Sequence, residues 1–78
     1  MSVTVWSKPG CVQCDATTRA LRRLGVEFRE VDVSTDAAAR DLVAGMGFLQ
    51  APVVQAGSVV WSGYRPDRIE ALAGELVG

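Results

Sequence analysis

Two cysteines, Cys11 and Cys14, are the residues of this chain best suited to chemistry, and they stand three positions apart. The sequence of 78 residues holds no other cysteine and no histidine. Without histidine there can be no Ser–His–Asp triad, no Cys–His dyad and no histidine-ligated metal in this chain. A disulfide that closes so short a loop would add little stability, which disfavours a purely structural pair. The chemistry that these residues can perform is therefore the chemistry of the two thiols.

The sequence around the cysteines predicts that they open a helix. Residues 3–6 (Val-Thr-Val-Trp) have the β-branched and aromatic composition of a strand, and a loop through Pro9 and Gly10 follows. A helical pattern starts at Cys11, where free backbone N–H groups and the positive end of the helix dipole favour an anion. We therefore expect Cys11 to ionise readily and act as the nucleophile. Cys14, one turn deeper on the same side, is then the less ionised, resolving thiol.

A metal site is the alternative use of the same pair, because Cys-x-x-Cys is also half of a four-cysteine zinc site. One chain offers only two thiolates, so zinc or an iron–sulfur cluster would need a second chain or outside ligands. We expect dithiol redox chemistry instead, with no metal and no bound cofactor, the redox group being the Cys11–Cys14 disulfide. Lys8, the only lysine, either stabilises the thiolate or is a solvated loop charge. Asp32, at a strand end, is a candidate acceptor for the Cys14 proton.

Hydrophobic periodicity predicts three helices and four strands in the order β-α-β-α-β-β-α. The first helix has an apolar stripe that begins at Val12 and stops before Gly25. The second helix, over residues 36–44, is capped by Ser34 or Thr35 and turns Leu42 inward. The later strands cover residues 26–33, 51–54 and 58–61, and the last helix starts at Pro66.

Two details of these strands stay open. The alternation in residues 26–33 changes phase late, which allows a bulge or a strand end there. The last two strands turn about Ala56 and Gly57 as a hairpin. A first βαβ unit followed by a hairpin implies an α/β class with a mixed four-stranded sheet flanked by three helices. We expect one domain over residues 1–78.

Composition excludes several classes of function. Eight basic and nine acidic side chains give a net charge of −1, which predicts neither a nucleic-acid nor a membrane-surface partner. Hydrophobic residues make up 49% of the chain, which argues against disorder. No apolar run approaches the roughly 20 residues of a membrane span. The first residues lack the basic start and long apolar stretch of a signal peptide, so we expect a cytoplasmic protein.

Two further features permit a functional or a structural interpretation. Pro52 follows Ala51 at the start of a strand that otherwise has the pattern of a central one, where proline needs a special geometry. Either a cis or a trans Ala51–Pro52 bond satisfies that position, and the trans form is the commoner. Trp61 and Tyr64 stand in a segment between the hairpin and the last helix, where aromatics anchor partners or fill the rim of a small core.

Three segments together resemble the NrdH-type redoxins, which are small glutaredoxin-like members of the thioredoxin fold. They are Ser-Lys-Pro-Gly-Cys-Val-Gln-Cys at residues 7–14, Gln-Ala-Pro-Val-Val at 50–54 and Trp-Ser-Gly-Tyr-Arg-Pro-Asp at 61–67. The resemblance spans nearly the whole chain. It implies a thioredoxin fold, a cis Pro52 facing the dithiol, Cys11 as nucleophile and Cys14 as resolving thiol.

The resemblance also implies a biological role. NrdH-type redoxins donate electrons to class Ib ribonucleotide reductase and are recharged by thioredoxin reductase with NADPH, and we expect a monomer. We assign supporting roles to Pro52, Lys8 and Ala51, and partner contacts to Val12, Gln13, Trp61, Tyr64 and Arg65. The alternative is a glutathione-dependent glutaredoxin or mycoredoxin. Glutaredoxins more often carry Cys-Pro-Tyr-Cys and a glutathione site with paired Gly and paired Asp, neither of which this chain has.

Overall fold

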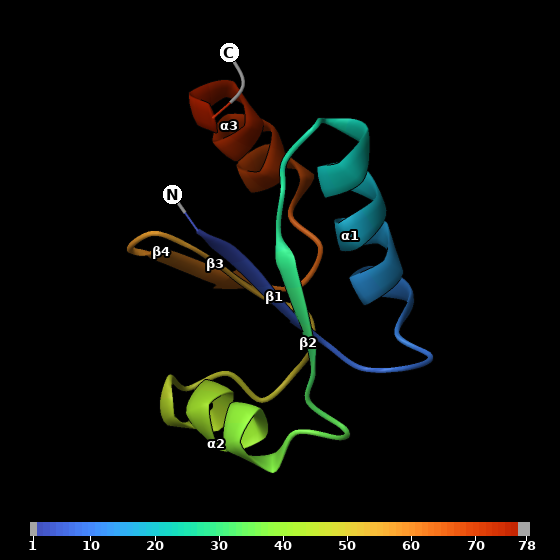
Figure 1. The fold of residues 1–78 in the computed structure, drawn as a ribbon, viewed down its shortest axis with the longest axis vertical. Coiled ribbons are helices and arrows are strands. Elements are labelled where there is room, and N and C mark those ends of the chain that lie inside the picture. The colour runs from blue at the N-terminus through green and yellow to red at the C-terminus, as the bar shows by residue number, and fades with distance from the viewer. Residues whose placement is uncertain (1, 77–78) are drawn as a thin grey trace.

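Within residues 2–76, which the computed structural model of the chain describes, helices and strands follow one another in the predicted order (Figure 1). The elements are β1 (Val3–Ser7), α1 (Val12–Arg23), β2 (Arg29–Asp32), α2 (Ala37–Gly45), β3 (Val53–Ala56), β4 (Val59–Ser62) and α3 (Pro66–Leu76).

The four strands form one mixed sheet in the order β2-β1-β3-β4. β1 runs parallel to β2 and antiparallel to β3, and β3 runs antiparallel to β4. This topology is the predicted thioredoxin fold. In the sheet register Trp6 lies opposite Val53, and Val53 lies opposite Ser62. The end of β1, the start of β3 and the end of β4 therefore lie side by side at one end of the strands.

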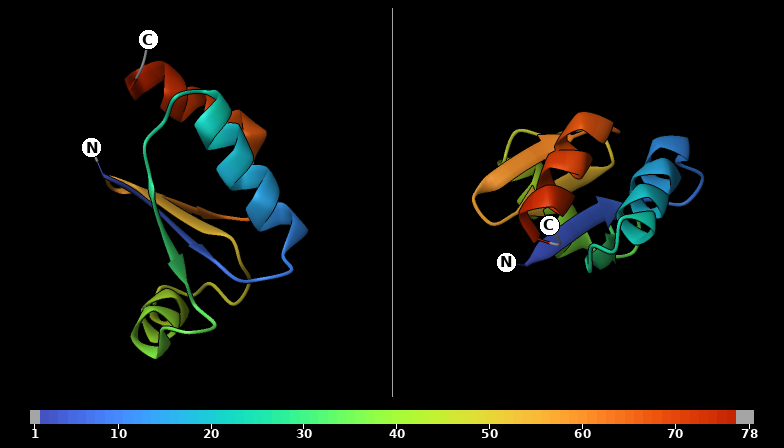
Figure 2. Two further views of the ribbon diagram at one scale, coloured as in Figure 1. Left: turned by 45° about the vertical axis from the view of Figure 1, so that its right-hand side comes forward. Right: turned by 90° about the horizontal axis from the view of Figure 1, so that it is seen from above.

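Helices cover both faces of the sheet, with α1 and α3 side by side on one face and α2 alone on the other (Figures 1 and 2). The larger core lies under α1 and α3 and includes Val5, Leu21 and Ile69. The smaller core lies under α2 and includes Trp6 and Val43. Val5 and Trp6 are neighbours in β1 and point to opposite faces, as the pleat of a strand requires.

The second strand starts later than predicted. β2 begins at Arg29, and residues 26–28 form the connection from α1. Val26 and Phe28 pack against the larger core, whereas Val31 packs against the smaller one. The ladder with β1 runs without a break from Arg29 to Asp32. The alternation changes phase because the residues before β2 pack on one face of the sheet and those within β2 pack on the other. No bulge is present in β2.

Two predicted apolar contacts are wrong, because Val12 and Leu42 are 82% and 55% exposed. The predicted cap of α2 is also wrong, since the Asp36 carboxylate accepts from the Ala39 N–H at 3.0 Å. Ser34 instead belongs to the preceding turn, where its hydroxyl donates to Asp32. Helical periodicity identified the helices, but it did not show that Val12 and Leu42 lie on sides of α1 and α2 that stay open to solvent.

The hairpin is shifted along the chain relative to the prediction. β3 begins at Val53 rather than Ala51, and the turn is made by Gly57 and Ser58. Gly57 has φ +61°, in the left-handed region that favours glycine. The shift leaves Ala51 and Pro52 outside the ladder, free to form part of the loop beside the cysteines.

A pair of leucines tests this division between core and surface. Leu21 is fully buried in the larger core, so Leu21→Ala should lower the free energy of unfolding by about 2–5 kcal/mol. Leu49 is 91% exposed, and Leu49→Ala should change it by less than about 0.5 kcal/mol. Urea denaturation of the reduced protein measures both changes. Equal losses in the two variants would contradict the described core.

Candidate active site

Cys11 is the N-cap of α1, and its sulfur occupies the position of the usual capping oxygen. Gly10, with φ +73°, makes the turn that leads out of β1. The Cys14 backbone N–H donates to Cys11 Sγ at 3.1 Å. The Asp15 N–H donates to the Cys11 carbonyl oxygen at 3.1 Å. The sulfur therefore lies where helix N–H groups and the helix dipole stabilise negative charge.

Cys14 lies one turn into α1 and faces the interior, with only 2% of its surface exposed. Burial, followed by the hydrogen bond with Cys11, raises the pKa of Cys14 to about 11, and a backbone hydrogen bond from Lys8 opposes the rise. Both cysteines are free thiols, and Cys11 is the more accessible one. Lys8 itself is an exposed loop residue. The pair has the predicted asymmetry of exposure, with a reachable sulfur in front of a buried one.

The loop before β3 approaches the cysteine pair from across the sheet. The Ala51–Pro52 peptide bond is cis, as the family resemblance implies. Cys11 Sγ lies 3.8 Å from the Ala51 carbonyl oxygen, to which its S–H can donate. Pro52 is buried and has no N–H, while its carbonyl oxygen accepts from the Gly63 N–H at 2.8 Å. The proline loop thus contacts both Cys11 and the segment after β4.

The loop between β4 and α3 closes the third side of the site. Its Tyr64 N–H donates to the side-chain oxygen Oε1 of Gln13 at 3.1 Å. Gly63 has φ +83°, and a Cβ atom placed there would lie 3.4 Å from the same oxygen. Gln13 and Tyr64 are 51 positions apart in the sequence, so sequence patterns gave no sign of this link. The first turn of α1, the proline loop and the loop after β4 are therefore joined by hydrogen bonds around Cys11.

Trp61 lies in β4, at the end of the predicted strand 58–61, and not in the loop that follows. It is 5% exposed and packs in the larger core, which favours the structural interpretation over a contact with a partner. The run Ser-Val-Val-Trp that contains it has the composition of a strand, and the tryptophan is simply its buried member. Tyr64 is 38% exposed and stays available on the surface.

Two charged candidates make local contacts. Arg65 Nη2 lies 3.3 Å from Asp67 Oδ2, at the start of α3. The Asp32 carboxylate accepts from the N–H and the hydroxyl of Ser34 at 2.8 and 2.6 Å, and these bonds hold the pKa of Asp32 below its usual range. A carboxylate with a lowered pKa, bonded to its own turn, is a poor candidate for the acceptor of the Cys14 proton that the sequence suggested.

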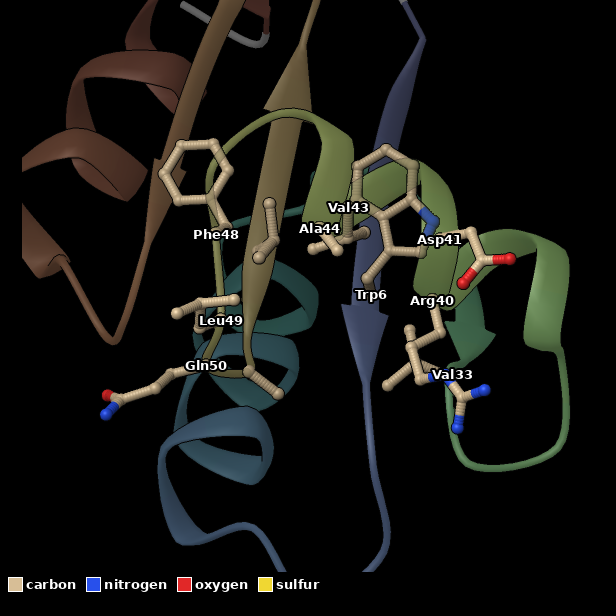
Figure 3. Close-up of a pocket in the computed structure, with 11 residues that line it drawn as sticks. Trp6, Val33, Arg40, Asp41, Val43, Ala44, Phe48, Leu49 and Gln50 are labelled. Carbon is tan, nitrogen blue, oxygen red and sulfur yellow. The ribbon is translucent and has the colours of Figure 1, made fainter.

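A hollow beside the proline loop was missed by the sequence analysis. It has a volume of about 320 Å³ and lies between α2 and the loop of residues 48–51, with Trp6 in its wall (Figure 3). Leu49, which also lines it, is 91% exposed. Together with Val12 at the start of α1 and Tyr64 in the loop after β4, Leu49 adds a third exposed apolar side chain to this side of the molecule. The adjacent apolar residues Phe48 and Leu49, in the short segment between a helix and the proline, were the sequence signal.

Other kinds of site have less support. Among residues 2–76, no group of three or more His, Cys, Asp or Glu side chains is arranged to hold a metal ion. None of the helices in the described part of the chain is both long and apolar enough to cross a membrane.

Comparisons with known sequences point in one direction. The glutaredoxin family model matches residues 3–61. The glutaredoxin-like protein NrdH of Salmonella typhimurium is 47% identical over 72 residues, which cover 92% of this chain and 89% of the relative. The NrdH protein of Lactococcus lactis subsp. cremoris is 34% identical over 71 residues, covering 91% of this chain and 99% of the relative.

Solved structures agree with these sequences. The structure of the glutaredoxin-like NrdH-redoxin from Escherichia coli superposes with a TM-score of 0.90 and 42% identity, covering 92% of this chain and 95% of that one. A buckwheat glutaredoxin–glutathione complex superposes with a TM-score of 0.72 at 22% identity, which supports the shared fold alone.

The burial of Cys14 predicts how it reacts when it is the only thiol. In Cys11→Ser, iodoacetamide should label Cys14 at pH 7 at least about tenfold more slowly than it labels free cysteine. Because burial, the largest cause of the raised pKa of Cys14, remains in this variant, the rate should keep rising beyond pH 9, where the rate for free cysteine levels off. Mass spectrometry of samples quenched at successive times measures the rate. A pH profile like that of free cysteine would contradict the assigned environment.

Proposed function

Because the chain belongs to the glutaredoxin family, as one of its NrdH-type redoxins, we propose that it carries electrons from thioredoxin reductase to class Ib ribonucleotide reductase. The chain is a thiol–disulfide oxidoreductase. The NrdH-redoxin of E. coli is a glutaredoxin-like protein with a thioredoxin-like activity profile, which supports the proposed electron source. The observation that carries the proposal is the accessible Cys11 sulfur, held at a helix N-terminus in front of the buried Cys14.

The first step is attack by the Cys11 thiolate on a disulfide of the partner. A bond forms between Cys11 Sγ and one partner sulfur, and the partner's S–S bond breaks. The other partner sulfur leaves as a thiolate and takes up a proton. The Cys14 N–H, 3.1 Å from Cys11 Sγ, stabilises the attacking thiolate before the bond forms.

The second step uses Cys14, whose thiolate attacks Cys11 Sγ and releases the second partner sulfur. The partner has then gained two electrons and two protons, and this chain holds the Cys11–Cys14 disulfide. Cys14 must lose its proton for this attack, and its pKa of about 11 keeps that event rare in the free dithiol. Thioredoxin reductase then returns two electrons from NADPH, so no bound cofactor is needed in the redoxin.

The partner surface in this proposal is built from the start of α1, the loop before β3 and the loop after β4. Val12 and Leu49 are the most exposed apolar side chains of that region, and Tyr64 adds an aromatic ring. Exposed apolar and aromatic groups around a reactive atom suit a protein surface that excludes water on docking. We place this reaction in the cytoplasm, with the redoxin acting as a monomer.

The use of glutathione is disfavoured by the shape and charge of the same region. A tripeptide anion needs placed positive charge and free backbone N–H groups. Here Arg65 lies against Asp67, and the Gly63 and Tyr64 N–H groups are used internally. The segment after β4 also lacks the paired Gly and paired Asp of a glutathione site.

Trapping tests the assigned roles of the two cysteines. Cys14→Ser should accumulate a stable mixed disulfide with a disulfide-bonded protein substrate, because the resolving thiol is gone. Cys11→Ser, the matched control, should trap none, because the remaining thiol is buried. Non-reducing electrophoresis separates the species. Equal trapping by the two variants would overturn the assignment.

A coupled assay tests the electron source. Thioredoxin reductase with NADPH should reduce the Cys11–Cys14 disulfide rapidly, and the reduced redoxin should sustain ribonucleotide reductase. Glutathione with glutathione reductase should reduce it at least about tenfold more slowly, since the N–H groups it would need are occupied. NADPH consumption at 340 nm reports both reactions. Equal or faster turnover with glutathione would favour the glutaredoxin alternative.

A further inference from the structure

Gln13 stands between the two cysteines, yet its side-chain oxygen is directed at the protein itself. Oε1 accepts from the Tyr64 N–H at 3.1 Å, across 51 positions of sequence. The residue before it, Val12, points into solvent and is 82% exposed. The two central residues of the Cys-x-x-Cys motif therefore differ, one being open to a partner and the other holding a neighbouring loop.

The loop that Gln13 holds has two anchors on successive amides. Gly63 N–H donates to the Pro52 carbonyl oxygen at 2.8 Å, and Tyr64 N–H donates to Gln13. The first anchor is backbone to backbone and does not depend on any side chain. The second depends entirely on Gln13. If Gln13 lost its oxygen, the Gly63 anchor would remain, while the Tyr64 backbone would turn to water for a partner.

Tyr64 is important because it is a partly exposed aromatic residue, and it is bonded to the helix turn that follows Cys11. An aromatic side chain contributes most to docking when its segment is already ordered in the free protein. Binding then loses less conformational entropy. A tyrosine on a loosened loop would have to be ordered by each partner in turn. Gln13 thereby affects partner affinity without touching the partner through its oxygen.

We propose that Gln13 is a positioning residue, which fixes the backbone of Tyr64 and so the place from which its ring meets protein partners when their disulfide reaches Cys11. The inference rests on the proposed function, because it needs a protein partner to dock beside Tyr64. It assigns to Gln13 an effect on partner binding and none on the sulfur chemistry. Loss of the Gln13–Tyr64 bond should raise KM for a protein partner by about three- to tenfold and leave kcat within about twofold.

The experiment compares Gln13→Leu, which keeps the size but removes the acceptor, with Gln13→Glu, which keeps an oxygen acceptor in place. Arg19→Leu is the matched control, a polar-to-leucine change at another exposed position of α1. Amide hydrogen exchange by NMR should show that Gln13→Leu loses protection at Tyr64 and keeps it at Gly63. Gln13→Glu and Arg19→Leu should keep both.

Kinetics with two disulfide partners complete the test. KM and kcat are measured for thioredoxin reductase with NADPH, and for insulin reduction with dithiothreitol as the reductant. In each of the two assays in which the wild-type protein is active, Gln13→Leu should raise KM. Gln13→Glu should have a KM close to that of the wild-type protein. In a Tyr64→Ala background, Gln13→Leu should add less than about a further twofold, because its effect passes through Tyr64.

The outcomes separate this inference from the proposed function. A wild-type protein that thioredoxin reductase does not reduce would reject the proposed electron source, while the insulin and exchange measurements still decide the role of Gln13. Unchanged Tyr64 protection in Gln13→Leu, or an unchanged KM despite lost protection, would overturn the inference. Additive effects of Gln13→Leu and Tyr64→Ala would overturn it as well.

Discussion

The hydrogen bond from the Cys14 N–H to Cys11 Sγ is the interaction on which the rest of the site depends. A helix begins with N–H groups that have no partner within the helix, and a side chain from the capping residue normally satisfies one of them. Here the capping atom is the reactive sulfur, at 3.1 Å. The same contact therefore starts α1, favours negative charge on Cys11 and fixes the position of Cys14 one turn further on.

The sheet explains why two other loops reach this sulfur. β1 and β3 are neighbours and run antiparallel, so the chain leaving β1 passes the chain about to enter β3. β4 pairs with β3, and the end of β4 lies beside the start of β3, which brings Gly63 to the Pro52 carbonyl oxygen. The Ala51 carbonyl oxygen is thus held 3.8 Å from Cys11 Sγ by strand pairing. Large side chains such as Leu21 and Val54 fill the core behind it and keep that pairing in place.

Local pattern predicted the element order and the cysteine pair, because each depends on residues close together in the chain. Pro52 was ambiguous by pattern, and its cis bond followed only from the family resemblance. Trp61 was left with two interpretations, a partner contact or a core residue, since aromatic residues at the end of a strand have the same local composition on a surface or in a core. The Gln13–Tyr64 link was missed, because it joins positions 51 apart and depends on the finished sheet. The predictable part of the site is thus its chemistry, and the unpredictable part is what surrounds it.

The most direct test of this account asks whether the reactive sulfur is also the cap of α1. Cys11→Ser keeps a capping acceptor and Cys11→Ala removes it, while both variants lose the nucleophile. Urea denaturation under reducing conditions gives their free energies of unfolding. The account predicts that Cys11→Ala is less stable than both the reduced wild-type protein and Cys11→Ser, by about 1 kcal/mol, within the usual range for a lost N-cap. Equal stabilities would contradict it, because the sulfur would then hold no part of the helix.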